Sequence, residues 1–321
     1  MGQTMTQKIT ARAAGRQTVT PGEIVAVHID RMMINDLIGP TAFSAFEELG
    51  ANNVVNQERI RVCIDHVVPP DTTQLADEYC YIRDFCAKYG LTGFNEIGRH
   101  GIGHQVMCED FTRPGEIAVG TDSHSPTYGG LGAFGFGING SDAAVALATG
   151  KIWMSVPEAI RIDLVGNLQP GVTAKDIALH LFGLGDDEIF IYRNLEIGGP
   201  GLGQVSVSGR LTIANMAAEM DIKACIMEPD GLLAEYLGDE ECCSLKADAD
   251  ADYAARFTVN LSNIEPLIAC PHNNHNVKPV REVRGVPIQQ VVLGSCTNGR
   301  MEDLCQAAEI LKGRRVAPDV R

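Results

Sequence analysis

The chain has 321 residues, of which 45% are hydrophobic and 21% charged, and its formal net charge is -15 at pH 7. This length suits two domains, and the composition is that of a packed globular protein. The acidic balance argues against nucleic acid or an anionic membrane as a partner, and no apolar run approaches the roughly 20 residues of a membrane span.

The ten cysteines are irregularly spread and include no CxxC pair of the kind that binds zinc. Residues 1–20 also lack the apolar segment of a secretory signal peptide. Reduced thiols and a cytoplasmic location are therefore expected.

The first part of the chain alternates predicted helices and strands. Helices are expected over 7–16, 41–49 and 73–89, and strands over 24–27 and 60–64. The second strand ends at Asp65-His66, where the carboxylate can hold one ring nitrogen and leave the other free for proton transfer. The alternative is a capping Asp beside a surface His.

Two histidines, His100 and His104, are spaced i, i+4 after the third helix. On a helix this spacing would suit a metal, but Gly101 and Gly103 disfavour a helix there. A loop that turns His104 toward a site is the expectation.

The densest polar stretch follows the predicted strand that begins at Ile117. This strand delivers Asp122, Ser123 and His124 together, and a glycine-rich loop then leads into a helix over 141–149. Neighbouring side chains cannot form a hydrolase triad with one another, but they can line a pocket with groups from other strands. The glycines would let backbone N–H groups approach a small anion.

The second half begins with a predicted strand over 160–165, followed by helices over 174–182 and 211–220 and a surface segment over 237–254. Asn215 and Glu219 stand at i, i+4 and would share one helix face. Their Ala and Met neighbours favour a buried carboxylate, and an exposed helical Glu is the alternative.

Near the end, the apolar run 291–293 reads as a buried strand that delivers Cys296 to a loop before a helix over 302–311. Such a cysteine could be a metal ligand, a nucleophile or simply a packed residue. The alternation of strands and helices predicts α/β domains with mainly parallel sheets, whose site lies beyond the carboxyl ends of the strands.

Taken together, these motifs resemble the aconitase superfamily over essentially the whole chain. The most specific are Thr-Asp-Ser-His at residues 121–124 and Gly-Ser-Cys-Thr-Asn at 294–298. The likeness is greatest to the large subunits of two-subunit hydro-lyases of the 3-isopropylmalate dehydratase type, and homoaconitase, aconitase and 2,3-dimethylmalate dehydratase are alternatives. The resemblance implies three-layer α/β/α domains, here 1–159, 160–283 and the start of a third over 284–321.

The resemblance also implies a reaction and a cofactor. The reaction would be the reversible dehydration of a hydroxy di- or tricarboxylate at a [4Fe–4S] cluster held by three cysteines, whose open iron acts as a Lewis acid. The implied roles are proton delivery to the leaving hydroxyl by Asp65 and His66, holding of the iron-bound water by Asp122, His124 and Glu219 with support from His104, positioning of substrate or cluster by Asn35, Ser123 and Asn215, and cluster ligation by Cys296.

The chain departs from this pattern after Cys296. The family places its other two cluster cysteines in a downstream CxxC, which these residues lack, and Cys305 falls inside a predicted helix. The sequence therefore looks like a C-terminally truncated large subunit, and we expect an absent or incomplete cluster. A small subunit with the swivelling domain is the implied partner.

Two other functions are weighed against this one. A cluster-free RNA-binding role is disfavoured by the net charge of -15. A nicotinamide-dependent oxidoreductase rests only on the GxGxxG pattern of Gly130, Gly132 and Gly135, which does not follow its strand directly.

Overall fold

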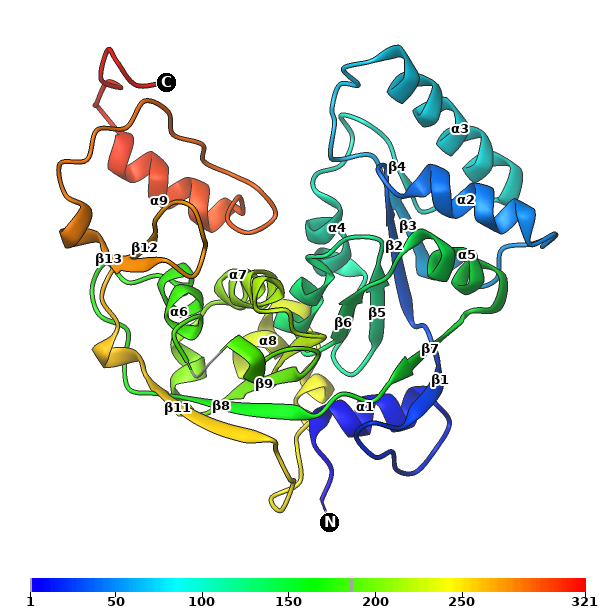
Figure 1. Cartoon of the computed structure of the whole chain (residues 1–321), viewed down its shortest axis with the longest axis horizontal. Coiled ribbons are helices and arrows are strands. Elements are labelled where there is room, and N and C mark those ends of the chain that lie inside the picture. The colour runs from blue at the N-terminus through cyan, green and yellow to red at the C-terminus, as the bar shows by residue number, and fades with distance from the viewer. Residues whose placement is uncertain (1, 185–186) are drawn as a thin grey trace.

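Two parallel β-sheets with helices packed on them form most of the protein, as the computed structural model shows for residues 2–184 and 187–321 (Figure 1). The first sheet has the order β4-β3-β2-β5-β6, and all its neighbouring strands run parallel. Its strands are β2 (Arg31–Asn35), β3 (Ile60–Cys63), β4 (Phe94–Asn95), β5 (Ile117–Gly120) and β6 (Phe134–Gly137).

Both faces of the first sheet are covered, because the apolar residues of its strands point alternately to the two sides. Met32 and Ile34 of β2 belong to a core with one helix layer, whereas Met33 belongs to a core on the other face. The first layer consists of α2 (Gly39–Glu48), α3 (Thr73–Tyr89) and α5 (Gly140–Thr149), and the opposite face carries α4 (Gly103–Asp110) and the 3-10 helix η2 (Ser125–Leu131).

The second sheet has the order β10-β9-β8-β11, also parallel throughout. Its strands are β8 (Ala159–Val165), β9 (Asn194–Gly198), β10 (Ala224–Met227) and β11 (Ala255–Asn260). Helices α6 (Ala174–Leu181) and α7 (Val207–Met216) pack on one face with Ile160, Ile162 and Leu195. Helix α1 (Met5–Ala13) contacts β9, and the N–H groups of Met5 and Thr6 at its start bind the buried carboxylate of Glu196.

The two sheets meet where η2 packs against α7 and β10. A side chain at Gly129 would overlap the carbonyl oxygen of Cys225, and a Cβ at Gly130 would lie 2.7 Å from the backbone nitrogen of Leu211. These glycines therefore permit close packing between the two halves. The sequence suggested instead that they approach an anion, and that interpretation is wrong for this pair.

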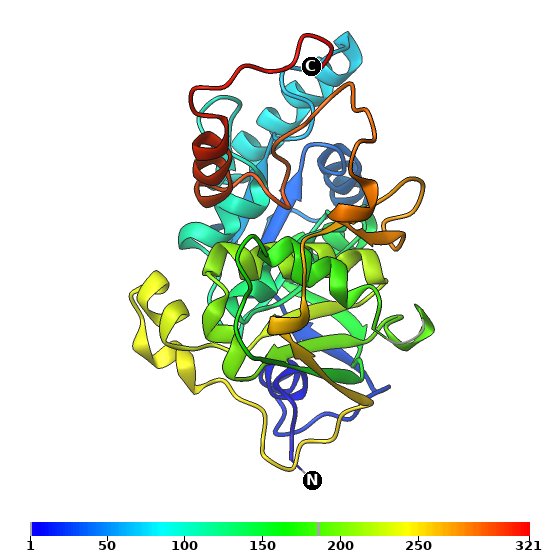
Figure 2. The ribbon, with the colours of Figure 1, turned by 90° about the vertical axis from the view of Figure 1, so that its left-hand side faces the viewer.

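Smaller elements complete the fold, and the C-terminal segment lies at the end of the molecule opposite the N-terminus in both views (Figures 1 and 2). Two antiparallel pairs consist of β1 (Ile24–His28) with β7 (Lys151–Ser155) and of β12 (Leu267–Ala269) with β13 (Val277–Pro279). The remaining helices are α8 (Gly231–Leu237), α9 (Met301–Leu311) and the 3-10 helices η1 (Gln57–Arg59), η3 (Asp187–Ile189), η4 (Pro200–Gln204), η5 (Ala217–Met220), η6 (Glu240–Ser244), η7 (Leu261–Asn263) and η8 (Val280–Val283).

The predicted α/β class with mainly parallel sheets is confirmed, and most predicted elements are present within two residues of their bounds. The predicted domain limit at 159/160 falls at the start of β8, and the limit at 283/284 falls at the end of η8. The division into domains stays a prediction.

Three local expectations are wrong. His104 lies in the first turn of α4 and not in a loop, because the Asp65 carboxylate accepts a 2.6 Å hydrogen bond from the N–H of Gly103 and caps the helix start. The run 291–293 forms no strand, and its side chains are 53–83% exposed. An apolar run becomes a strand only by pairing, and the described residues supply it no partner strand.

The third concerns Glu219, which is exposed and not buried. Helix α7 ends at Met216 and tightens into η5, after which Asp221 reverses the chain with φ +55°. This turn carries Glu219 to the surface of the site, where its side chain is 44% exposed.

Candidate active site

Three neighbouring strands of the first sheet deliver polar residues to one edge. Asn35 of β2 pairs in register with Cys63 of β3, and Met33 of β2 with Gly120 of β5. Since the strands are parallel, the residues that follow them emerge side by side. These residues are Asp36 after Asn35, the last residue of β2, Asp65 and His66 after β3, and Thr121 and Asp122 after β5.

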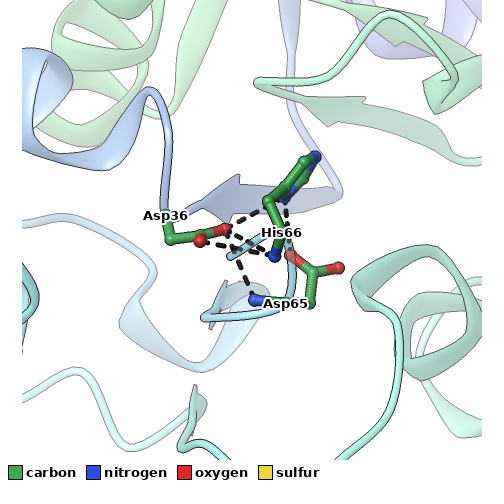
Figure 3. Close-up of side chains that lie close together, drawn as sticks. All are labelled: Asp36, Asp65 and His66. Carbon is green, nitrogen blue, oxygen red and sulfur yellow. Dashed lines mark hydrogen bonds and ion pairs between the residues drawn. The ribbon is translucent and has the colours of Figure 1, made fainter. Parts of the chain in front are cut away.

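The His66 ring lies among three carboxylates, of which Figure 3 shows Asp36 and Asp65, and Asp122 is the third. Its Nδ1 lies 3.0 Å from Asp36 Oδ1 and 2.9 Å from Asp65 Oδ1, and its Nε2 lies 3.1 Å from Asp122 Oδ2. Hydrogen bonds to Asp122, Asp36 and Asp65 raise the pKa of His66 to about 12. The geometry therefore favours an imidazolium that donates from both nitrogens.

Asp36 is the most enclosed of these carboxylates, with a fully buried side chain. It accepts hydrogen bonds from the backbone N–H groups of Asp65, His66 and Val67, and the hydroxyl of Tyr79 lies 2.6 Å from its Oδ2. Burial alone would raise the pKa of Asp36, but the hydrogen bonds from His66 and Tyr79 hold it well below its ordinary value.

Asp36, Asp65 and His66 also stand close enough together to resemble a cation site. The donors around Asp36 already occupy both of its oxygens, and His66 Nδ1 lies at hydrogen-bond distance from two carboxylates. A cation would have to displace these donors. The group is therefore better described as a hydrogen-bonded ion cluster.

Asp122 joins His66 to a second histidine. Its Oδ1 lies 2.9 Å from His104 Nε2, while His104 Nδ1 lies 3.1 Å from the hydroxyl of the buried Tyr128. Burial raises the pKa of Asp122, but its contacts with His104, His124 and His66 outweigh that effect and hold it far below its ordinary value. Asp122 is thus an anion that orients two imidazole rings.

His124 forms the third pairing, with a residue that follows the second sheet's helix α7. Its Nε2 lies 3.0 Å from Glu219 Oε1, and contacts with Asp122, together with this hydrogen bond, raise the pKa of His124 against the effect of burial. Asn274 donates a 3.0 Å hydrogen bond to the other Glu219 oxygen. The loop between β12 and β13 therefore fixes the carboxylate.

Asn215 connects this region to the cysteine loop. Its buried amide donates to Thr127 Oγ1 at 2.9 Å and accepts from Thr297 Oγ1 at 2.7 Å. Arg300 donates to the carbonyl oxygens of Cys296 and Thr297. Cys296 is consequently held on an ordered, half-buried loop beside α7.

The role of Cys296 as a cluster ligand depends on the other potential metal ligands near it. A [4Fe–4S] cluster is held by several thiolates. In the ranges 2–184 and 187–321 no group of three or more potential metal ligands includes Cys296, and Cys305 is exposed on α9. The described residues offer one of the thiolates and do not by themselves fit the cluster.

The predicted residues fall into one constellation with two qualifications. Asp65, His66, His104, Asp122, His124 and Glu219 form a continuous series of contacts, and Ser123 Oγ lies 3.4 Å from His124 Nδ1. Asn35 is 2% exposed, and its amide donates hydrogen bonds to the carbonyl oxygen of Thr121 and to the carboxylate of Asp122. It therefore holds Asp122 in place and is too buried to contact a substrate directly. Asn215 likewise is buried and holds Thr127 and Thr297.

Sequence reasoning missed Asp36 and Tyr79 as parts of the site. The available signal was the polar pair Asn35-Asp36 after the apolar run Met32 to Ile34, which has the same form as Asp65-His66 after β3. Tyr79 carries no such signal, because it occupies an ordinary apolar position of an amphipathic helix.

Comparison with known proteins agrees with this arrangement. The aconitase family (aconitate hydratase) matches residues 7–286 and 276–321. The chain belongs to the aconitase family.

Among members of the aconitase family, a protein of Methanothermobacter thermautotrophicus named a probable 3-isopropylmalate dehydratase large subunit is 43% identical over 325 residues. A 3-isopropylmalate dehydratase large subunit of Thermodesulfovibrio yellowstonii is 42% identical over 326 residues. Each alignment covers 100% of this chain and 77% of the relative.

A solved structure, the holo-form of aconitase X from Thermococcus kodakaraensis, shares the fold with a TM-score of 0.51 and 13% identity. The structural alignment covers 89% of this chain and 68% of the aconitase X chain. No helix in the described part of the chain is long and apolar enough to span a membrane.

Proposed function

We propose that this aconitase-family chain is the large subunit of a hydro-lyase of the 3-isopropylmalate dehydratase type. It would interconvert 2- and 3-isopropylmalate through the alkene, as in leucine biosynthesis. The observation that carries the proposal is the identity of over 40% to two so-named large subunits along the whole chain. The carboxylate–histidine constellation supports it, since elimination of water needs a positioned proton donor.

His66 is the proposed donor. Its two ring nitrogens face carboxylates on opposite sides, so the ring carries a proton on Nε2, next to Asp122. In the dehydration direction that proton would pass to the departing hydroxyl, and the C–O bond would break to release water. A base supplied by the proposed small subunit would take the proton from the adjacent carbon, so that the double bond forms. In hydration the same nitrogen would take the proton back.

The other residues would hold the oxygen that leaves as water. Asp122 and Glu219 are acceptors that face one region from the two sheets, and His124 lies between them. His104, fixed by Tyr128, would keep Asp122 in place, and Ser123 would contact a substrate carboxylate. Cys296 would ligate the cluster.

Relatives in the family are named large subunits, so a small subunit is the proposed partner. We infer that a [4Fe–4S] cluster forms only when further thiolates join Cys296. The 321 residues alone would hold none, or an incomplete one.

The test is turnover by the complete large subunit assembled with its small subunit and reconstituted with iron and sulfide. Addition of 3-isopropylmalate should produce the ultraviolet absorbance of the alkene, and citrate and homocitrate serve as competing substrates. A preparation that contains the cluster and turns over none of these acids would overturn the proposal.

A further inference from the structure

The contacts around Asp36 go beyond what a capping residue needs. Its carboxylate receives N–H groups from three successive residues, 65 to 67, together with the hydroxyl of Tyr79 and the ring of His66. Three consecutive amides that converge on one anion force the backbone to wrap around it. The segment that carries Asp65 and His66 is thus shaped by a residue that directly follows the neighbouring strand β2.

We propose that Asp36, held by Tyr79, is a positioning residue that fixes the orientation of the His66 ring for proton transfer. This rests on the proposed function in one respect only, the proton that His66 delivers. The placement of Asp36 itself follows from the contacts.

The geometry explains why Asp65 alone is insufficient. Asp65 is the sequence neighbour of His66, and its second oxygen is engaged by the N–H of Gly103 at the start of α4. Its Oδ1 lies 2.9 Å from His66 Nδ1, but an adjacent residue moves with the histidine and cannot by itself define where the ring stands. Asp36 directly follows β2, so its contact with Nδ1 fixes the position of the ring relative to the sheet.

Tyr79 in turn fixes the carboxylate plane. Its hydroxyl lies 2.6 Å from Asp36 Oδ2 and 2.9 Å from the carbonyl oxygen of Val67, and its ring is 1% exposed in the core with α3. The hydroxyl has one proton, and the shorter contact to an anion is the stronger one. With Oδ2 held, Oδ1 remains directed at His66 Nδ1.

This device acts through His66 and touches no reacting atom. Removing it should leave substrate binding unchanged and slow the chemical step, because a misplaced ring meets the hydroxyl less often in the productive geometry. KM should therefore stay within about twofold of wild type while kcat falls.

The variants are Asp36→Asn and Tyr79→Phe, with Tyr81→Phe as the matched control. Tyr81 lies on the same helix α3 and donates to Glu47 at the surface, away from the site. In the assembled holoenzyme, kcat per cluster should fall about 100-fold in Asp36→Asn and about fivefold in Tyr79→Phe, within the range of a general acid's contribution. Tyr81→Phe should behave as wild type.

A second arm needs no activity and uses this chain alone. Hydrogen exchange of the amides at 65–67, read by mass spectrometry, should accelerate about tenfold or more in Asp36→Asn, since bonds to a charged acceptor are lost. If wild type shows no turnover, the proposed function fails while exchange still tests Asp36. An unchanged exchange rate, or a normal kcat in both site variants, would overturn the proposal. If Asp36→Asn does not fold, Tyr79→Phe decides it.

Discussion

His124 and Glu219 are 95 positions apart in the sequence, and their side chains meet at 3.0 Å between Nε2 and Oε1. His124 follows β5 of the first sheet, whereas Glu219 follows α7, which packs on the second sheet. This pairing therefore forms only when the two sheets are docked, and the complete site depends on that docking.

Gly129 is the residue through which docking can be tested. A Cβ added there would overlap the backbone carbonyl of Cys225, which cannot move without displacing β10. We expect Gly129→Ala to lower the free energy of unfolding by about 3 kcal/mol, at the upper end for overpacked sites. Urea denaturation measures it.

Gly203→Ala is the matched control for this substitution, because nothing lies within 4 Å of the added methyl group. The urea midpoint of Gly203→Ala should equal that of wild type. Equal midpoints for the two variants would show that the sheets do not need this close approach.

Asp122 should be the most sensitive carboxylate of the site, since it bridges His66 and His104. We expect Asp122→Asn to lower kcat of the assembled enzyme by about 100-fold or more, because an amide cannot accept from both rings on equal terms. Asp77→Asn, an exposed position on α3, is the control. Activity of Asp122→Asn near that of Asp77→Asn would contradict the proposed role.

Some of this site could be predicted from the sequence, because polar residues that end parallel strands meet at one edge. Asp65, His66, Asp122 and His124 were identified in that way. The contact of Asp36 with His66 could not be predicted, since it depends on β2 lying next to β3. The short strand β2, which contains two methionines, shows no clear alternation of polar and apolar residues that would predict it.

Other features depend on tertiary packing and leave no local pattern. The i, i+4 spacing of Asn215 and Glu219 suggested one shared helix face. The helix instead ends at Met216, which leaves Asn215 buried and Glu219 exposed. The apolar run 291–293 likewise reads as a strand, although strand formation needs a neighbour that local sequence cannot reveal.

The stability of the chain should fall as the pH rises above neutrality. The pKa of His66 is raised from 6.5 to about 12, so its stabilisation is fully present below pH 6.5 and is lost as pH rises toward 12. The decline that His66 alone causes is at most about 1.4 kcal/mol per pH unit. Asp36 and Asp122 have lowered pKa values, so their contribution is lost only as pH falls below about 4.

Urea midpoints at pH 6.5 and pH 9 measure this decline. His66→Asn should be less stable at pH 6.5 and show a smaller decline, because the raised pKa of His124 still contributes some. His28→Asn, on the exposed face of β1, should decline as wild type does. A wild-type midpoint that is constant between these pH values would contradict the charged state assigned to His66.

Asn215 should control the accessibility of the cysteine loop. Its amide is the partner of the Thr297 hydroxyl, next to Cys296, and it is fully buried. In Asn215→Ala the hydroxyls of Thr127 and Thr297 lose this partner, which should lower the free energy of unfolding by about 1–3 kcal/mol. The loosened loop should also expose the Cys296 thiol, so its alkylation by iodoacetamide should accelerate.

Peptide mass spectrometry can follow the alkylation of Cys296, with the exposed Cys305 as internal reference. Asn263→Ala, a surface change on η7, is the control variant. If Cys296 and Cys305 keep the same ratio of alkylation rates in Asn215→Ala as in the control, Asn215 does not hold the loop, and the order around Cys296 must come from Arg300 and its bonds to the carbonyl oxygens of Cys296 and Thr297.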